Sequence, residues 1–102
     1  MNCDISGANI TLMDLTLLRA FATVARVGNL TRAAAQLHLT QPAVSLQIKN
    51  LQEALGVTLF SRTSHGLALT RDGQALLPHA ERALAAAADV ERAASALRQE
   101  VR

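Results

Sequence analysis

Polar side chains and one cation gather on one side of the stretch 41–55, QPAVSLQIKNLQEAL, where they could contact a nucleic acid. At 100° per residue in a helix, four apolar residues of this stretch fall within about 60° of one another, which predicts its buried side. They are Val44, Ile48, Leu51 and Leu55. On the opposite, predicted exposed side lie Pro42, Leu46, Lys49 and Glu53, flanked by Gln41 and Ser45. Amide and hydroxyl groups in the first half of a helix, followed by one cation, suit insertion into the major groove of duplex DNA.

Further cations that could contact DNA lie on either side of this helix. In the stretch 30–37, Arg32 and the amides of the first helical turn could clamp a phosphate, and an ordinary solvated helix start is the alternative. Arg62 and His65 lie near the tip of a predicted hairpin and could reach phosphates or the minor groove. A purely structural hairpin with incidental charge remains the alternative there.

The pattern of titratable and nucleophilic residues does not suggest catalysis or metal binding. The three histidines lie on separate predicted elements without the spacing of metal ligands. No carboxylate pair, no nucleophile with a base and no phosphate-binding glycine loop is present in the sequence. We therefore expect no enzyme activity, no metal and no cofactor. Cys3 is the only cysteine, which fits a reducing, cytosolic setting.

Charge is distributed unevenly along the 102 residues. Residues 15–71 contain six Lys or Arg and one Glu, whereas residues 72–102 contain four Arg and five acidic residues. This asymmetry is typical of a chain in which one part meets a polyanion and the other meets protein, although an ordinary solvated surface would also allow it. The chain has no 18-residue apolar run, so we expect no membrane span.

Capping and turn residues predict the helices that hold the candidate contacts. Residues 1–12 show no periodicity, which predicts a flexible N-terminal extension. Asp14 can cap a first helix of about 13 residues that ends at Gly28. The predicted inward stripe of this helix is Leu15, Leu18, Ala22 and Ala25, widened by Leu17, Phe21 and Val24.

Two further caps define a helix pair with a short turn. Asn29 can cap the helix 30–37, and Thr40 can cap the next helix, with Pro42 in its first turn. Between them, His38 occupies a turn position that favours positive φ. After Gly56 the spacing changes to two strand-like runs, 58–62 and 66–70, which predict a hairpin. We therefore expect a mainly α fold over residues 13–70, a winged helix-turn-helix of three helices and a two-stranded β wing.

Thr70 can cap a long final helix of about 28 residues, from Arg71 to roughly Arg98, within the segment 71–102. Apolar and small residues recur along it at alternating intervals of four and three, which is a heptad stripe. The stripe consists of Leu76, Ala80, Ala83, Ala87, Val90, Ala94, Leu97 and Val101. We expect it to pair with a second copy of the chain. The alternative is an alanine-rich helix that is merely a good helix former.

From Met13 to about Ala94 the chain resembles the N-terminal domain of LysR-type transcriptional regulators. The most specific motifs are TRAAAQLHLTQPAVS, LQEALGVTLFSR and LTRDGQALL, in order and with the spacing of the family. The resemblance implies a bacterial, nucleoid-associated DNA-binding protein that binds specific double-stranded sequences and controls transcription. It also implies an antiparallel dimer through the long helix, within assemblies that are commonly tetramers.

The resemblance also implies which residues contact DNA, because the DNA-contacting positions of the family correspond here to Thr31, Arg32, Gln41, Pro42, Ala43, Ser45 and Arg62. Of the cations, Lys49 and Arg32 are expected to serve phosphates. Two residues depart from the family pattern, which often has Arg where this chain has Leu46 and His65. We expect Leu46 to contact DNA through its carbon atoms or to mark a subset with altered specificity. His65 would make the wing contact weaker and more dependent on pH.

The family has a second, larger domain that senses a small effector, and this sequence contains only the first domain. We therefore expect either a fragment of a longer protein or a natural short form. The alternative function is a helical protein-interaction module without specific DNA binding, in which the long helix is the working surface.

Overall fold

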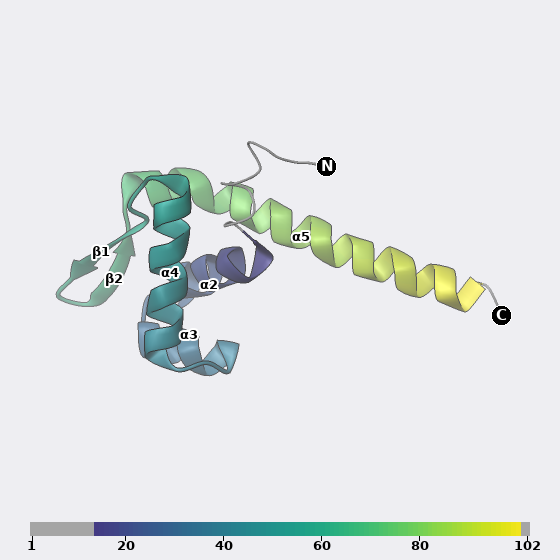
Figure 1. Ribbon diagram of the computed structural model, residues 1–102, viewed down its shortest axis with the longest axis horizontal. Helices are drawn as coiled ribbons and strands as arrows, with labels where there is room; N and C mark the ends of the chain where they lie inside the picture. Colours follow the sequence, from purple (N-terminus) through teal and green to yellow (C-terminus); the bar gives the residue numbers. More distant parts are fainter. Residues whose placement is uncertain (1–13, 101–102) are drawn as a thin grey trace.

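Four helices and one hairpin make up residues 14–100, the part of the chain that the computed structural model describes (Figure 1). In chain order they are α2 (Leu15–Val27), α3 (Leu30–Leu37), α4 (Gln41–Leu55), β1 (Phe60–Thr63), β2 (Gly66–Leu69) and α5 (Arg71–Glu100). This arrangement confirms the predicted mainly α, winged helix-turn-helix fold. The predicted extension, residues 1–12, and the stripe residue Val101 lie outside the described residues.

The helices begin at the predicted capping residues. Asp14 Oδ1 accepts a hydrogen bond of 3.1 Å from the Leu17 amide, and Asn29 Oδ1 accepts one of 2.8 Å from the Arg32 amide. Thr40 Oγ1 accepts a bond of 3.2 Å from the amide of Ala43. Each cap satisfies an amide that has no partner within its own helix. These local bonds set where α2, α3 and α4 start.

The turn between α3 and α4 depends on an unusual backbone conformation. His38 has φ 59°, and it is the only non-glycine residue with positive φ in the stretch 14–100. The Leu39 amide donates to the Ala34 carbonyl at 2.9 Å, which closes the end of α3. The prediction of a strained turn residue at His38 is therefore confirmed, and this turn determines the angle at which α4 leaves α3.

The hydrophobic core surrounds α2, which contacts α3, α4 and α5. The largest fully buried side chains of the described chain are Phe21, Val24, Val44, Leu51 and Leu59. The rings of Phe21 and Phe60 meet edge to face at 5.7 Å.

The predicted inward stripe of α2 is partly wrong. Leu15 is 42% exposed, while Ala20 and Thr23, which lie outside the predicted stripe, are buried. The physical reason is that α2 is covered by three helices, so its buried face is wider than the single stripe that one neighbour would need.

The wing is attached to the helices by backbone and side-chain hydrogen bonds. Its antiparallel strands pair Phe60 with Leu69 and Thr63 with Gly66. At its base, the Leu59 amide donates to Gln52 Oε1 at 2.8 Å, and the Thr70 amide donates to the Leu59 carbonyl at 2.9 Å. These bonds fix the wing next to the C-terminal half of α4.

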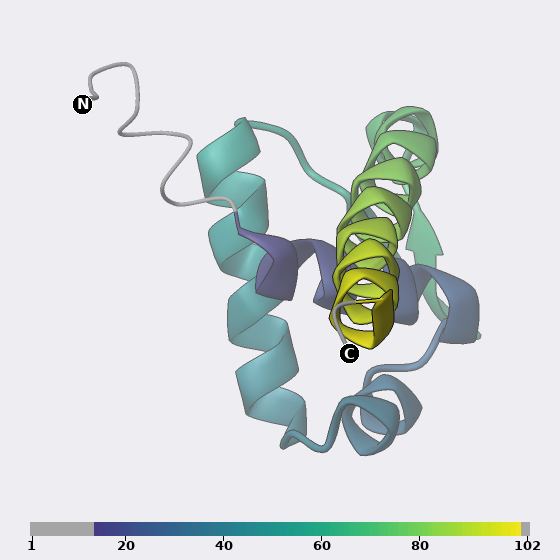
Figure 2. The ribbon, with the colours of Figure 1, turned by 90° about the vertical axis from the view of Figure 1, so that its right-hand side faces the viewer.

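The last helix extends well beyond the body of the protein (Figures 1 and 2), and with this helix included the principal extents are 56 × 33 × 24 Å. Its first part packs on α2: Ala80 is 4% exposed, and Leu77 and Leu84 lie against the core. Within the described chain, no residue after Leu84 belongs to that core.

The prediction that Ala80 is available to a partner is therefore wrong, and Leu76 and Ala83 of the same stripe are only partly exposed. Ala80 is buried by its own chain, and Leu76 and Ala83 pack against the same core. The core thus continues past the predicted domain boundary at residues 70 and 71. The reason is that the side of α2 that α3 and α4 leave uncovered is covered by the start of α5. No helix among residues 14–100 is both long and apolar enough to cross a membrane.

Candidate nucleic-acid interface

Helix α4, the candidate for contact with a nucleic acid, buries one face and exposes the other, as the periodicity predicts. Val44, Ile48 and Leu51 are buried, and Leu55 is partly buried against the same core. The outward side chains Gln41, Pro42, Leu46, Lys49 and Glu53 are exposed, with Leu46 at 55%, whereas Ser45, also predicted on this side, is partly buried. The first half of α4 is therefore available to a ligand, whereas its buried face holds it in place.

The wing brings a cation to the side of α4. Arg62 pairs with Leu67 across the hairpin and lies two residues after Phe60, so all three side chains occupy one face of the hairpin. Phe60 packs on the core, which turns this face toward the helices. The alternation of the strand therefore directs Arg62 toward α4.

Two shallow hollows meet at Arg62. One, of about 190 Å³, separates α4 from the wing and is lined by Leu30, Ser45, Ile48, Lys49, Gln52, Phe60, Arg62 and Leu67. The other, of about 170 Å³, reaches the start of α3 and is lined by Asn29, Leu30, Thr31, Gln41, Arg62, Gly66 and Leu67. The structure thus gathers Thr31, Gln41, Ser45, Lys49 and Arg62, which come from three elements, around one concave surface.

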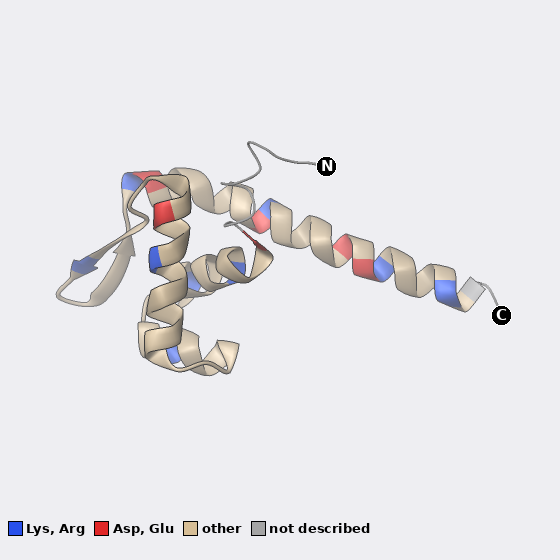
Figure 3. Ribbon diagram, in the orientation of Figure 1, with Lys and Arg blue, Asp and Glu red and all other residues tan. Residues whose placement is uncertain are grey.

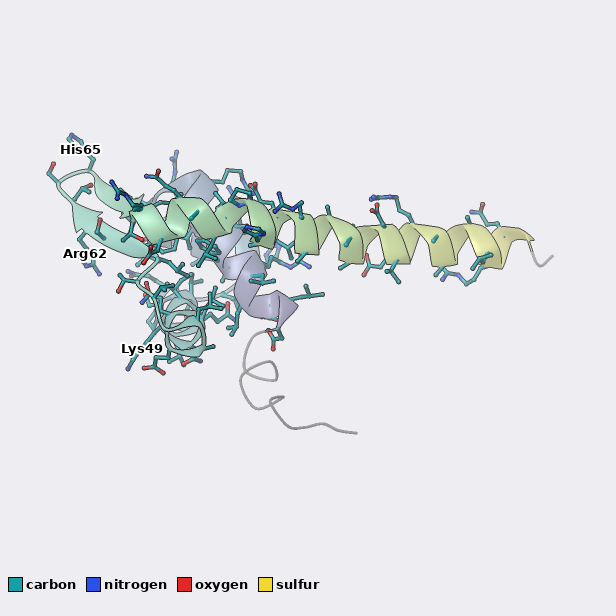
Figure 4. All side chains as sticks on the ribbon, turned by 90° about the horizontal axis from the view of Figure 1, so that it is seen from above. Lys49, Arg62 and His65 are labelled. Carbon is teal, nitrogen blue, oxygen red and sulfur yellow. The ribbon has the colours of Figure 1, made fainter. Side chains whose placement is uncertain are left out.

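Other predicted contacts lie apart from these hollows. His65 projects from the tip of the wing, away from Arg62 and Lys49 (Figure 4). Its Nδ1 lies 3.1 Å from the Ser64 hydroxyl oxygen. Arg32 is exposed on α3 but lines neither hollow.

On α4 itself, three predicted contacts also lie outside the hollows. Pro42 and Leu46 are on the exposed side of the helix, and neither lines a hollow. Ala43 is partly buried, and its amide is bonded to Thr40. What Ala43 can offer a ligand is therefore its methyl group.

Sequence reasoning missed two polar side chains of this surface. Asn29 and Gln52 line the hollows, and Gln52 also accepts the hydrogen bond from the buried Leu59. The sequence identified Asn29 only as a cap and assigned no role to Gln52. The helical spacing of Gln52, three residues after Lys49, was the available signal, but its partner becomes known only when the wing is placed.

Cations lie beside the hollow next to the wing. Lys49 and Arg62 line it, and no acidic residue lines this hollow or the one at the start of α3. A larger hollow of about 720 Å³ near the C-terminal end of α4 is lined by both signs, with Lys49 and Arg71 beside Glu53 and Asp72. Figure 3 shows blue and red segments together at that end of α4 and at the start of α5. The surface around the first half of α4 thus favours an anionic ligand. Within residues 14–100, no three His, Cys, Asp or Glu side chains are grouped as metal ligands would be.

Comparison with known proteins gives consistent matches. The model of the family described as bacterial regulatory helix-turn-helix protein, lysR family, matches residues 15–74. The transcriptional regulator CfxR of Cupriavidus necator is 45% identical over 86 residues, which are 84% of this chain and 27% of that protein. An uncharacterized regulator of Azotobacter vinelandii is 46% identical over 89 residues, or 87% of this chain and 62% of its own length.

A solved structure shows the same fold. The crystal structure of a CbnR DBD–DNA complex matches with a TM-score of 0.72 and 40% identity, and the match covers 81% of this chain and 99% of that one. This chain extends beyond the matched region, which is nearly all of the CbnR chain in that complex. It spans less than two thirds of the length of either sequence relative.

Proposed function

The chain belongs to the LysR family of bacterial regulatory helix-turn-helix proteins, and on that premise we propose that it binds specific double-stranded DNA sequences as a dimer and regulates transcription. One observation carries the proposal: the exposed first half of α4 lies beside Arg62 of the wing, on a surface that favours anions. A protein that acts on bacterial DNA in this way works in the cytoplasm, at the nucleoid.

In the proposed complex, α4 enters the major groove with its N-terminal half. Gln41 and Ser45 form hydrogen bonds to base edges, since an amide can pair with adenine and a hydroxyl can pair with several bases. Pro42, Ala43 and Leu46 contact bases through carbon atoms. The phosphate contacts come from Thr31, Arg32, Lys49, Arg62 and His65, and these set the position of α4 in the groove.

The proposed dimer forms through the outer part of α5. Val90 is 68% exposed and Leu97 is 61% exposed, and Ala87 and Ala94 lie on the same heptad stripe. Burying this stripe against a second copy removes apolar surface from water, and alanines let the two helices approach closely. Two copies of α4 would then meet half-sites in successive major grooves, about 34 Å apart. Tetramers would form in a longer protein.

The direct test is selection of bound duplexes from a random pool at a salt concentration that suppresses non-specific binding. We expect enrichment of a site with two related halves. Recovery of unenriched sequences, together with self-association of the protein, would instead support a protein-interaction module.

Substitutions separate the proposed roles of individual side chains. Gln41→Ala and Ser45→Ala should relax preference at particular positions of the selected site, each by about 1–3 kcal/mol. Arg32→Ala and Arg62→Ala should weaken binding to all sequences alike and reduce the slope of log K against log salt by about 0.9 each. Titrations of selected and scrambled duplexes at several salt concentrations measure both effects.

Arg82→Ala is the control, because it removes the same charge from an exposed position on α5. It should leave both the preference and the salt slope unchanged. Equal losses for all four test variants on both duplexes would contradict the division of roles.

A further inference from the structure

Building on the proposed function, we propose that Pro42 and Leu46 together select thymine by contacting its 5-methyl group in the major groove. The observation that prompts this is an exposed apolar pair in the N-terminal half of α4. Leu46 is 55% exposed, which is more than any other large apolar residue between positions 14 and 89. Pro42 is also exposed, four residues earlier.

The helix geometry places the two side chains side by side. Residues four apart in an α-helix differ by about 40° in direction, so Pro42 and Leu46 form one strip along α4. Neither residue lines the hollows beside Arg62. The strip therefore lies next to the polar surface of Gln41 and Ser45 and offers a ligand only carbon atoms.

The chemistry of the major groove identifies what such a strip can contact. Adenine, guanine and cytosine present hydrogen-bonding groups there, and thymine alone adds an apolar group, its C5 methyl. A hydrogen-bonding edge placed against Leu46 would lose water without gaining a partner, which disfavours the other bases. Thymine is thus the base that this surface accepts best.

The helical rise of α4 and the spacing of base pairs limit how far apart the contacted thymines can lie. Four helical residues rise about 6 Å, and base pairs are spaced by about 3.4 Å, so the two side chains can reach methyl groups no more than about two base-pair steps apart. Lys49 lies three residues after Leu46 and is exposed, so it could hold a phosphate beside the same strip. The selected site should therefore contain one or two essential thymines in each half.

The experiment uses deoxyuridine, which lacks the methyl group but keeps every hydrogen-bonding group of thymine. Each thymine of a selected duplex is replaced in turn, and the Kd is measured by fluorescence anisotropy at one salt concentration. For the unmodified protein we expect an increase in Kd of about fourfold per contacted methyl, at one or two positions in each half-site. The Leu46→Ala variant should have the same Kd for the thymine and the uracil duplex at the base that Leu46 contacts.

Two more variants sharpen the test. Leu15→Ala removes the same atoms from an exposed leucine on α2 and should keep the full discrimination between thymine and uracil. Leu46→Arg should move the preference at that position toward guanine, because the guanidinium can bind O6 and N7. Because Leu46 is on the surface, neither substitution at this position removes a core contact.

The outcomes distinguish this inference from the proposed function. A selected site that tolerates uracil at every position overturns the methyl contact but leaves sequence-specific binding intact. Discrimination that persists in Leu46→Ala also overturns it. Failure to select any site overturns the proposed function and this inference together.

Discussion

His38 and Gln52 show how single residues set the geometry of the interface. His38 has φ 59°, a conformation that costs an L-residue with a Cβ about 1–2 kcal/mol. Gln52 Oε1 accepts the amide of the buried Leu59 at 2.8 Å and so ties the wing to α4. Neither residue is one of the proposed DNA contacts, but one sets the angle of α4 and the other sets the distance between α4 and Arg62.

Replacing His38 with glycine should stabilise the fold, because glycine adopts positive φ without a Cβ penalty. The His38 side chain is exposed, so little packing is lost. We expect an increase of about 0.5–1 kcal/mol in the free energy of unfolding, measured by urea denaturation.

Ala35→Gly serves as the control for that substitution, since Ala35 is an exposed position within α3. It should lower stability by about 1 kcal/mol. A loss of stability in both variants would show that the His38 side chain itself stabilises the fold.

At the scale of elements, the junction of the wing and α5 is the most crowded part of the fold. A Cβ on Gly73 would lie 2.3 Å from the Leu59 carbonyl oxygen and 3.0 Å from Leu69 Cδ2. The Thr70 hydroxyl accepts the Gly73 amide at 3.0 Å and donates to the Thr58 carbonyl at 2.5 Å. The first turn of α5 therefore rests directly on the base of the wing.

Gly73→Ala should destabilise the protein, although alanine is the better helix former by about 1 kcal/mol. The added carbon would meet backbone at a distance that packing does not permit, and we expect a net loss of about 1–3 kcal/mol. Thermal unfolding followed by circular dichroism measures the change.

Gln74→Ala, at the adjacent exposed position, is the matched control and should change stability by less than about 0.5 kcal/mol. Gain of stability in Gly73→Ala would mean that the wing moves away from α5 at little cost.

At the scale of the whole molecule, the two parts of α5 have different roles. Its first part, as far as Leu84, completes the core over α2, while its outer part projects from the body (Figure 1). Val90 and Leu97 of this outer part are exposed. The same heptad stripe thus serves the fold of one chain at its start and the proposed dimer at its end.

Substitutions along the stripe should reveal this division. Val90→Asp combined with Leu97→Asp should shift the protein from dimer to monomer in analytical ultracentrifugation, because charge would be buried between the helices. The dispersed amide signals of α2 to α4 in an NMR spectrum should remain.

Ala80→Asp places the same charge in the core of the chain itself and should unfold the body or destabilise it by more than about 3 kcal/mol. If the double variant remained dimeric, the proposed pairing surface would be wrong. If Ala80→Asp left the body intact, the assignment of Ala80 to the core would be wrong.

Much of the fold could be predicted from the sequence, because its signals are local. The caps at Asp14, Asn29 and Thr40 act on amides three residues away, and positive φ at His38 is a property of one turn. The buried face of α4 follows from helical periodicity alone. These local effects also identified most of the residues on the candidate surface.

Other features were decided only by the tertiary structure. The width of the buried face of α2, the burial of Ala80 and the bond from Leu59 to Gln52 all depend on elements far apart in the sequence. The arrangement of Arg62 beside α4 depends on where the hairpin docks. The physical reason is that capping and periodicity act over a few residues, whereas the docking of one element on another is set by packing across the whole core.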